Sequence, residues 1–132
     1  MPNERDVVQM PENLDLGAAA GAPASAAVRA NGLIFTTGYM SLNPDTGELE
    51  PGTAEEETRR TLHALREVLA AAGSSLEKVI KAHVFLADID RDFDAMNAVY
   101  REFFDAPYPA RRTVQTKLIR GLKVEIEVIA TA

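Results

Sequence analysis

A run of basic residues near the C-terminus is the first feature that suggests chemistry. Between Asp105 and Glu125 the chain has five basic residues and no acidic one, although 20 acidic residues outnumber 14 basic ones overall. One interpretation is that these cations are solvated and keep a strand edge from pairing. The other is that they attract a small anion. Arg111 is the best candidate for that role, because Pro109 restrains its approach and a guanidinium can bind a carboxylate through two parallel hydrogen bonds.

An acidic residue within a predicted strand is the second candidate. Glu127 shares one face of that strand with Glu125, because side chains two residues apart point the same way. The simple interpretation is a solvent-exposed carboxylate. A Glu127 buried near a cationic site would instead position water or act as a general base. The spacing along the chain leaves both interpretations open.

Metal and cofactor chemistry lacks the residue patterns it needs. The chain has no cysteine, and its histidines, His63 and His83, match neither H-x-x-x-H nor H-x-x-E-H spacing. Gly38, Gly47 and Gly52 do not form a phosphate-binding loop motif. The hydroxyl residues Thr36, Thr37 and Ser41 do not lie in the G-x-S-x-G pattern of serine hydrolases. We therefore expect no metal ion and no cofactor.

Turn and capping signals divide the chain into alternating strands and helices. Asn31-Gly32 favours a hairpin turn between strands at 26–30 and 33–38. Thr53 and Glu56 form a capping-box pattern at the start of a helix over 54–72. The remaining pattern predicts a turn at 43–47, a strand at 79–87, a helix at 92–104, and two closing strands at 111–118 and 122–130 joined by a tight turn through Gly121.

The resulting order, ββαβαββ, predicts an α+β fold in which two helices cover one face of a mixed β-sheet. The last strand has one apolar row, which should face the helices, and one mixed row. The apolar row is Leu122, Val124, Ile126, Val128 and Ala130, and the mixed row is Lys123, Glu125, Glu127 and Ile129. A mixed face suits contact with other subunits, so we expect a homo-oligomer.

Length and composition predict one domain with a short arm. A chain of 132 residues has the size of a single domain. Residues 1–22 lack periodicity and end in a run of small residues, which predicts an extended N-terminal arm or loop, with the domain at 23–132. The net charge of −6 disfavours nucleic acid as a partner. We expect no membrane segment and a cytoplasmic location, because no apolar run is long enough and the N-terminus is acidic.

Seven short runs carry a resemblance to a known protein family. They are NGLIFTTG at 31–38, NPDTGE at 43–48, AAAGSSL at 70–76, VFLAD at 84–88, MNAVY at 96–100, PAR at 109–111 and VEIE at 124–127. Each run is short, but all seven occur in order with matching separations over residues 23–130. On these runs the sequence resembles the Rid/YjgF family of reactive-intermediate deaminases.

The resemblance implies a chorismate-mutase-like α+β fold, a homotrimer with sites in the clefts between subunits, and no cofactor. In similar proteins the residue that matches Arg111 binds the substrate carboxylate, and the residue that matches Glu127 holds or activates water. The matches add Thr37, Asn97 and Thr113 to the substrate-binding set. Tyr39 stands where a glutamine is common, and we expect it to fill part of the pocket.

The implied activity is hydrolysis of 2-imino and enamino acids, of the 2-iminopropanoate and 2-iminobutanoate class, to 2-oxo acids and ammonium. The expected ligand is therefore a small 2-imino or 2-oxo carboxylic acid. Similar proteins usually carry a tyrosine where this sequence has Ala24. The alternatives are a deaminase of a larger catabolic enamino acid and a non-catalytic trimer that binds small acids. A ribonuclease is the least favoured.

Overall fold

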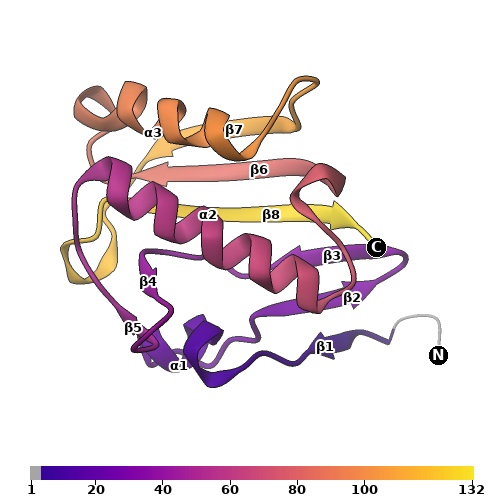
Figure 1. Cartoon of the computed structure of the whole chain (residues 1–132). Helices are drawn as coiled ribbons and strands as arrows, with labels where there is room; N and C mark the ends of the chain where they lie inside the picture. The colour runs from indigo at the N-terminus through magenta and orange to yellow at the C-terminus, as the bar shows by residue number, and fades with distance from the viewer. Residues whose placement is uncertain (1–3) are drawn as a thin grey trace.

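Six β-strands form one mixed sheet in the computed structural model, which describes residues 4–132. Their order across the sheet is β1-β2-β3-β8-β6-β7. Strand β6 lies between β8, to which it is antiparallel, and β7, to which it is parallel. Helices α2 and α3 lie on the same side of this sheet (Figure 1). The sequence-based prediction of a mixed sheet with two helices on one face is thus confirmed.

The elements contain the predicted ββαβαββ series, with β1, α1 and a small hairpin added. The strands of the main sheet are β1 (Asp6–Val8), β2 (Ala27–Ala30), β3 (Leu33–Thr36), β6 (Val79–Leu86), β7 (Ala110–Gln115) and β8 (Val124–Thr131). The separate hairpin pairs β4 (Leu42–Asn43) with β5 (Glu48–Leu49). The helices are α1 (Leu16–Ala20), α2 (Ala54–Ala71) and α3 (Ile89–Phe103), and short 3₁₀ turns lie at Glu12–Leu14, Leu76–Lys78 and Ile119–Gly121.

Helix α2 begins where its capping residues predict. The Thr53 hydroxyl accepts a hydrogen bond from the Glu56 backbone N–H, and the Glu56 carboxylate accepts one from the Thr53 N–H. The buried face of the helix includes Leu62, Leu65 and Leu69, all 0% exposed. This face packs on the sheet, opposite the apolar row of β8, which is also buried. The predicted apolar row of the last strand is thus confirmed.

Two predicted boundaries in the C-terminal half need correction. Helix α3 begins at Ile89 rather than at 92, because the Asp88 carboxylate caps it by accepting from the Arg91 N–H. The closing strands β7 and β8 are not joined as neighbours by a tight turn. They pair with opposite edges of β6, and the chain between them passes through the turn at Ile119–Gly121.

The N-terminal segment pairs with the sheet and contains a short helix. Strand β1 pairs with β2, with Val7 opposite Val28. Helix α1 occupies part of the segment that the sequence predicted to be extended or a loop. The Asp15 side chain caps its start, and Gly21, with φ 68°, ends it in the left-handed conformation. Residues 1–3 of the predicted arm lie outside the described residues, and the boundary between arm and domain at 22/23 stays a prediction.

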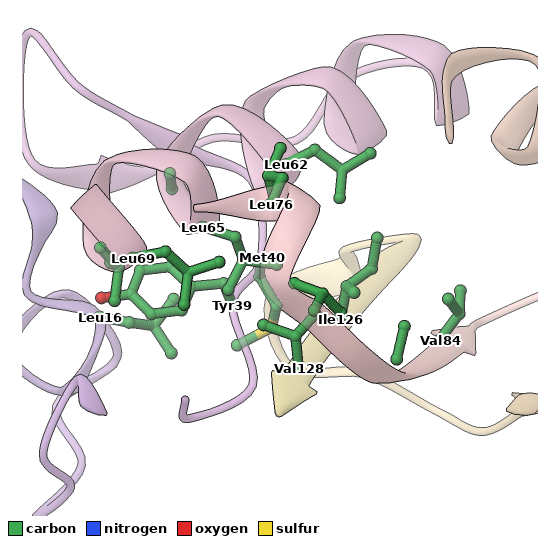
Figure 2. Close-up of a cluster of buried hydrophobic side chains, with 14 of the residues drawn as sticks. Leu16, Tyr39, Met40, Leu62, Leu65, Leu69, Leu76, Val84, Ile126 and Val128 are labelled. Atoms are coloured by element: carbon green, nitrogen blue, oxygen red, sulfur yellow. The ribbon is translucent and has the colours of Figure 1, made fainter. Parts of the chain in front are cut away.

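The hydrophobic core lies between the helices and one face of the sheet. Figure 2 shows Leu62, Leu65 and Leu69 of α2 beside Ile126 and Val128 of β8. The opposite face of the sheet carries no helix (Figure 1). Among residues 4–132, no helix is both long and apolar enough to cross a membrane.

Candidate active site

Arg111 lies on edge strand β7 with its side chain on the helix-covered side of the sheet. Its neighbour in the register is the buried Ala82 of β6. The guanidinium carbon lies 4.8 Å from the centre of the Tyr100 ring and 5.9 Å from that of Phe93, both in α3. Burial is the main cause that lowers the pKa of Arg111. Within the described chain Arg111 forms no ion pair, so its charge is open to an anion.

A small pocket surrounds this guanidinium. Its volume is about 230 Å³. The residues that line it come from the last turns of α3, from the loop before β7 and from β7 itself: Asn97, Tyr100, Arg101, Tyr108, Pro109 and Arg111. The structure thus brings together two of the residues singled out from the sequence, Arg111 and Asn97.

Thr113 follows Arg111 by two residues on the same strand and faces the same side of the sheet. It is opposite the buried Val84 in the register of β6 and β7. Thr113 is half-buried but is not among the residues that line the Arg111 pocket. Thr113 therefore lies next to the pocket on β7, but in a single copy of the chain it does not line the pocket.

Glu125 and Glu127 lie on the opposite, open face of the sheet. The Glu127 carboxylate is 4.0 Å from Nδ1 of His83, its partner in the register. The Glu125 carboxylate lies against Gly38, where an added Cβ would be 2.9 Å from the Glu125 carboxyl carbon. Desolvation, and to a smaller extent the charge of Glu127, raises the pKa of Glu125. Glu125 is thus the carboxylate with the environment of a general base.

Thr37 belongs with the acidic residues rather than with Arg111. It follows β3, and its backbone N–H donates to the Ala26 carbonyl. The next residue, Gly38, contacts Glu125, and the following one, Tyr39, exchanges two backbone hydrogen bonds with Ile126. This pairing holds the Thr37-Gly38 backbone beside the carboxylates.

The side chains of Arg111 and of the two glutamates lie on opposite faces of one sheet. Arg111 is in register with Ala82, which faces the helices, whereas Glu127 is in register with His83, which faces away from them. The chain therefore supplies two half-sites: a cationic pocket at the edge of β7 and a carboxylate pair on the open face. A single copy does not bring them into one pocket.

The expectation that Tyr39 lines the substrate pocket needs correction. Its side chain is 0% exposed and packs in the core near Leu16 and Leu69, as Figure 2 shows. Its hydroxyl donates a 2.6 Å hydrogen bond to the Leu14 carbonyl. The two backbone hydrogen bonds to Ile126 orient the residue inward. Tyr39 therefore joins the N-terminal segment to the core and exposes no side-chain surface to a ligand in one chain.

Sequence reasoning missed four residues of the site, Glu125, Tyr100, Arg101 and Tyr108. Alternation placed Glu125 on the same face as Glu127, but only the tertiary structure shows that Glu125 lies against Gly38 and is desolvated by burial. Tyr100, Arg101 and Tyr108 line the Arg111 pocket, although the sequence marked none of them as a ligand-binding residue. In the described part of the chain, no three His, Asp or Glu side chains gather as a metal-ligand set. The absence of a metal and of a cofactor stays a prediction.

Comparisons with known proteins add to this geometry. The family model "Endoribonuclease L-PSP" matches residues 16–132. The chain is 49% identical over 114 residues to "Protein mmf2, mitochondrial" of Schizosaccharomyces pombe, over 83% of this chain and 88% of that protein. It is 42% identical to the 2-iminobutanoate/2-iminopropanoate deaminase of Capra hircus, over 85% of this chain and 82% of that one. The crystal structure of E. coli TdcF with bound serine has 33% identity and a TM-score of 0.84, and the match covers 96% of this chain and 98% of that one.

Proposed function

Because the chain belongs to the Rid/YjgF family, whose family model is named endoribonuclease L-PSP, we propose that it hydrolyses small 2-imino acids to 2-oxo acids and ammonium. The observation that carries this proposal is the unpaired, half-buried Arg111 in a small pocket. Such a group fits one carboxylate of a small acid. Relatives named imine deaminases support the reaction, and a bound serine in one family member supports a small carboxylate as ligand.

The chemistry requires little beyond positioning. Arg111 binds the carboxylate of the 2-imino acid and holds the adjacent C=N carbon in place. Water attacks that carbon, its oxygen forms a C–O bond, and the π electrons of the C=N bond move to nitrogen. The nitrogen takes up a proton, and the resulting carbinolamine loses ammonia as its C–N bond breaks and C=O forms. The imine carbon is electrophilic without a cofactor, so orientation and one proton-transfer group account for the rate.

We assign the proton-transfer role to Glu125. Its desolvated carboxylate takes a proton from the attacking water, and its raised pKa makes it a stronger base than an exposed glutamate. The protonated carboxyl then returns the proton to the departing nitrogen. Glu127, which the sequence analysis favoured, is 40% exposed and lies beside His83. It acts here through its charge, which helps to raise the pKa of Glu125.

A homotrimer would join the two half-sites. The open face carries an apolar row across four strands, in which Val7, Val28, Phe35 and Ile129 are successive partners in the register. Val7 and Phe35 are 45% and 38% exposed in one chain. Such a row suits burial against further copies of the chain. In the proposed trimer, Arg111 of one copy faces Glu125 of its neighbour.

The activity is tested by ammonia release. A threonine dehydratase generates 2-iminobutanoate in the assay, and a serine dehydratase generates 2-iminopropanoate. We expect ammonium to form faster with the protein than without it. Equal rates with and without the protein would contradict the proposed function.

The alternative activity, a ribonuclease, is tested by incubating the protein with RNA. Cleavage of RNA without imine hydrolysis would favour the ribonuclease.

The shared site is tested by mixing two inactive variants. Arg111→Ala lacks the carboxylate-binding group, and Glu125→Gln lacks the base. If the variants are unfolded and refolded together in equal amounts, mixed trimers each regain one intact site, and about a quarter of all sites become complete. We expect activity to return to about a quarter of the wild-type value. Activity no higher than that of the separately refolded variants would contradict a site formed between copies.

A further inference from the structure

Tyr100 carries a buried hydroxyl group whose proton has no acceptor among the described residues. The residue is 4% exposed, and its hydroxyl oxygen is the one enclosed side-chain polar atom of the described residues without a hydrogen-bond partner. Burial raises the pKa of this hydroxyl, which therefore keeps its proton and remains a donor. A buried donor without a partner destabilises a folded protein. A partner that arrives with a ligand would account for its presence.

The other two tyrosines do not share this property. The Tyr39 hydroxyl is also buried, but it donates to the Leu14 carbonyl. Tyr108 is 53% exposed, so water can reach it. The unsatisfied hydroxyl is therefore particular to Tyr100 and not a general feature of tyrosines in this fold.

The position of Tyr100 indicates which ligand group would meet its hydroxyl. Tyr100 lines the same pocket as Arg111, whose guanidinium carbon lies 4.8 Å from the centre of the Tyr100 ring. The guanidinium is close enough to the hydroxyl to lower its pKa, against the larger effect of burial, but a guanidinium has only donors and so leaves the hydroxyl proton without an acceptor. Phe104 stacks on the ring with a centroid distance of 4.5 Å and helps to hold it in place. An unpaired cation and an unpaired donor thus meet at one small pocket.

We propose that Tyr100 and Arg111 bind the same ligand carboxylate, with the Tyr100 hydroxyl donating a hydrogen bond to one of its oxygens. The identity of the acid rests on the proposed function, but the contact requires only a small carboxylate. Arg111 supplies the charge, and Tyr100 makes the pocket selective for an anion whose oxygen lies beside the guanidinium. Tyr100 is therefore a substrate-binding residue as well as part of the apolar face of α3.

The variant Tyr100→Phe tests this contact, because it removes the hydroxyl and keeps the ring over which Arg111 lies. Dissociation constants for 2-oxobutanoate and for butanoate are measured by calorimetry. We expect both acids to bind about 3- to 10-fold more weakly, by the same factor, since both present the carboxylate. The melting temperature should stay the same or rise, because the variant removes an unsatisfied buried group.

Tyr39→Phe is the matched control. It removes the hydroxyl of another buried tyrosine, one that has a partner in the protein. This variant should lower the melting temperature by a few degrees, about what one lost hydrogen bond costs, and leave the affinity for both acids unchanged. The opposite responses of the two variants separate a binding role from a structural one.

Two results would overturn the inference. One is unchanged affinity of Tyr100→Phe for both acids. The other is a loss confined to 2-oxobutanoate, which would assign the hydroxyl to the 2-oxo group instead of the carboxylate. The proposed function can fail separately: a wild-type protein that releases no ammonia, but whose carboxylate affinity depends on Tyr100, would refute the deaminase and leave this contact in place.

Discussion

Replacing Arg111 by alanine is expected to lower kcat/KM for 2-iminobutanoate by about two to three powers of ten. The guanidinium is half-buried against aromatic rings and has no acidic partner in the described chain, so its charge serves the ligand. Without it, the substrate carboxylate would enter a pocket with no charge to balance it. Steady-state ammonia release and the affinity for 2-oxobutanoate measure the two parts of the loss.

Two further variants test whether the loss is specific to the guanidinium of Arg111. Arg111→Lys should recover little activity, because an ammonium group cannot form the planar two-point contact. Arg59→Ala is the matched surface control, since Arg59 pairs with Glu102 and both side chains are about half exposed. That variant should retain nearly full activity. Wild-type turnover and 2-oxobutanoate affinity in Arg111→Ala would show that the carboxylate binds elsewhere.

Glu125→Gln is expected to lower kcat by about two powers of ten or more, while 2-oxobutanoate binding stays largely intact. The amide fills the same space against Gly38 but cannot accept a proton from water. The pH profile gives the sharper signature. Burial and Glu127 raise the pKa of Glu125, so in the wild type kcat should increase with pH as the carboxyl loses its proton at a pH above the usual glutamate range. In Glu125→Gln this increase should be absent.

Glu127→Gln tests the alternative assignment of the base. Removing its charge removes one cause of the raised pKa of Glu125, so the acidic limb of the profile should shift to lower pH. The loss in kcat should be smaller than for Glu125→Gln. A larger loss in Glu127→Gln, with the pH limb abolished, would instead identify Glu127 as the base.

The fold was predictable where local chemistry determines it. Asn31 has a positive φ of 52°, as the turn at Asn31-Gly32 requires, and Thr53 caps α2 as its spacing with Glu56 predicts. Helix α1 was missed because its small residues carry no apolar periodicity, and its form depends on a cap from Asp15 and a left-handed Gly21. The relation of β7 to β8 was missed because sequence adjacency favours a hairpin, whereas both strands pair with β6.

The site was predictable in its residue types but not in its arrangement. Arg111 and Asn97, which the resemblance implied to bind substrate, line one pocket, and their contact with substrate stays a prediction. The sequence placed Tyr39 in the pocket because nothing in the sequence indicates that its side chain points into the core. That orientation follows from the backbone hydrogen bonds between Tyr39 and Ile126. Burial desolvates Glu125, and its contact with Gly38 joins distant segments of the chain, so no spacing along the sequence reveals either.

Strand β1 has a practical consequence for work with this protein. It lies at one edge of the sheet and contributes Val7 to the exposed apolar row. A truncation that starts at residue 16, where the family match begins, would remove that strand and leave β2 as an unprotected edge. Expression designs trimmed to the family boundary would therefore expose backbone that invites aggregation, and designs that retain residues 6–8 would avoid it.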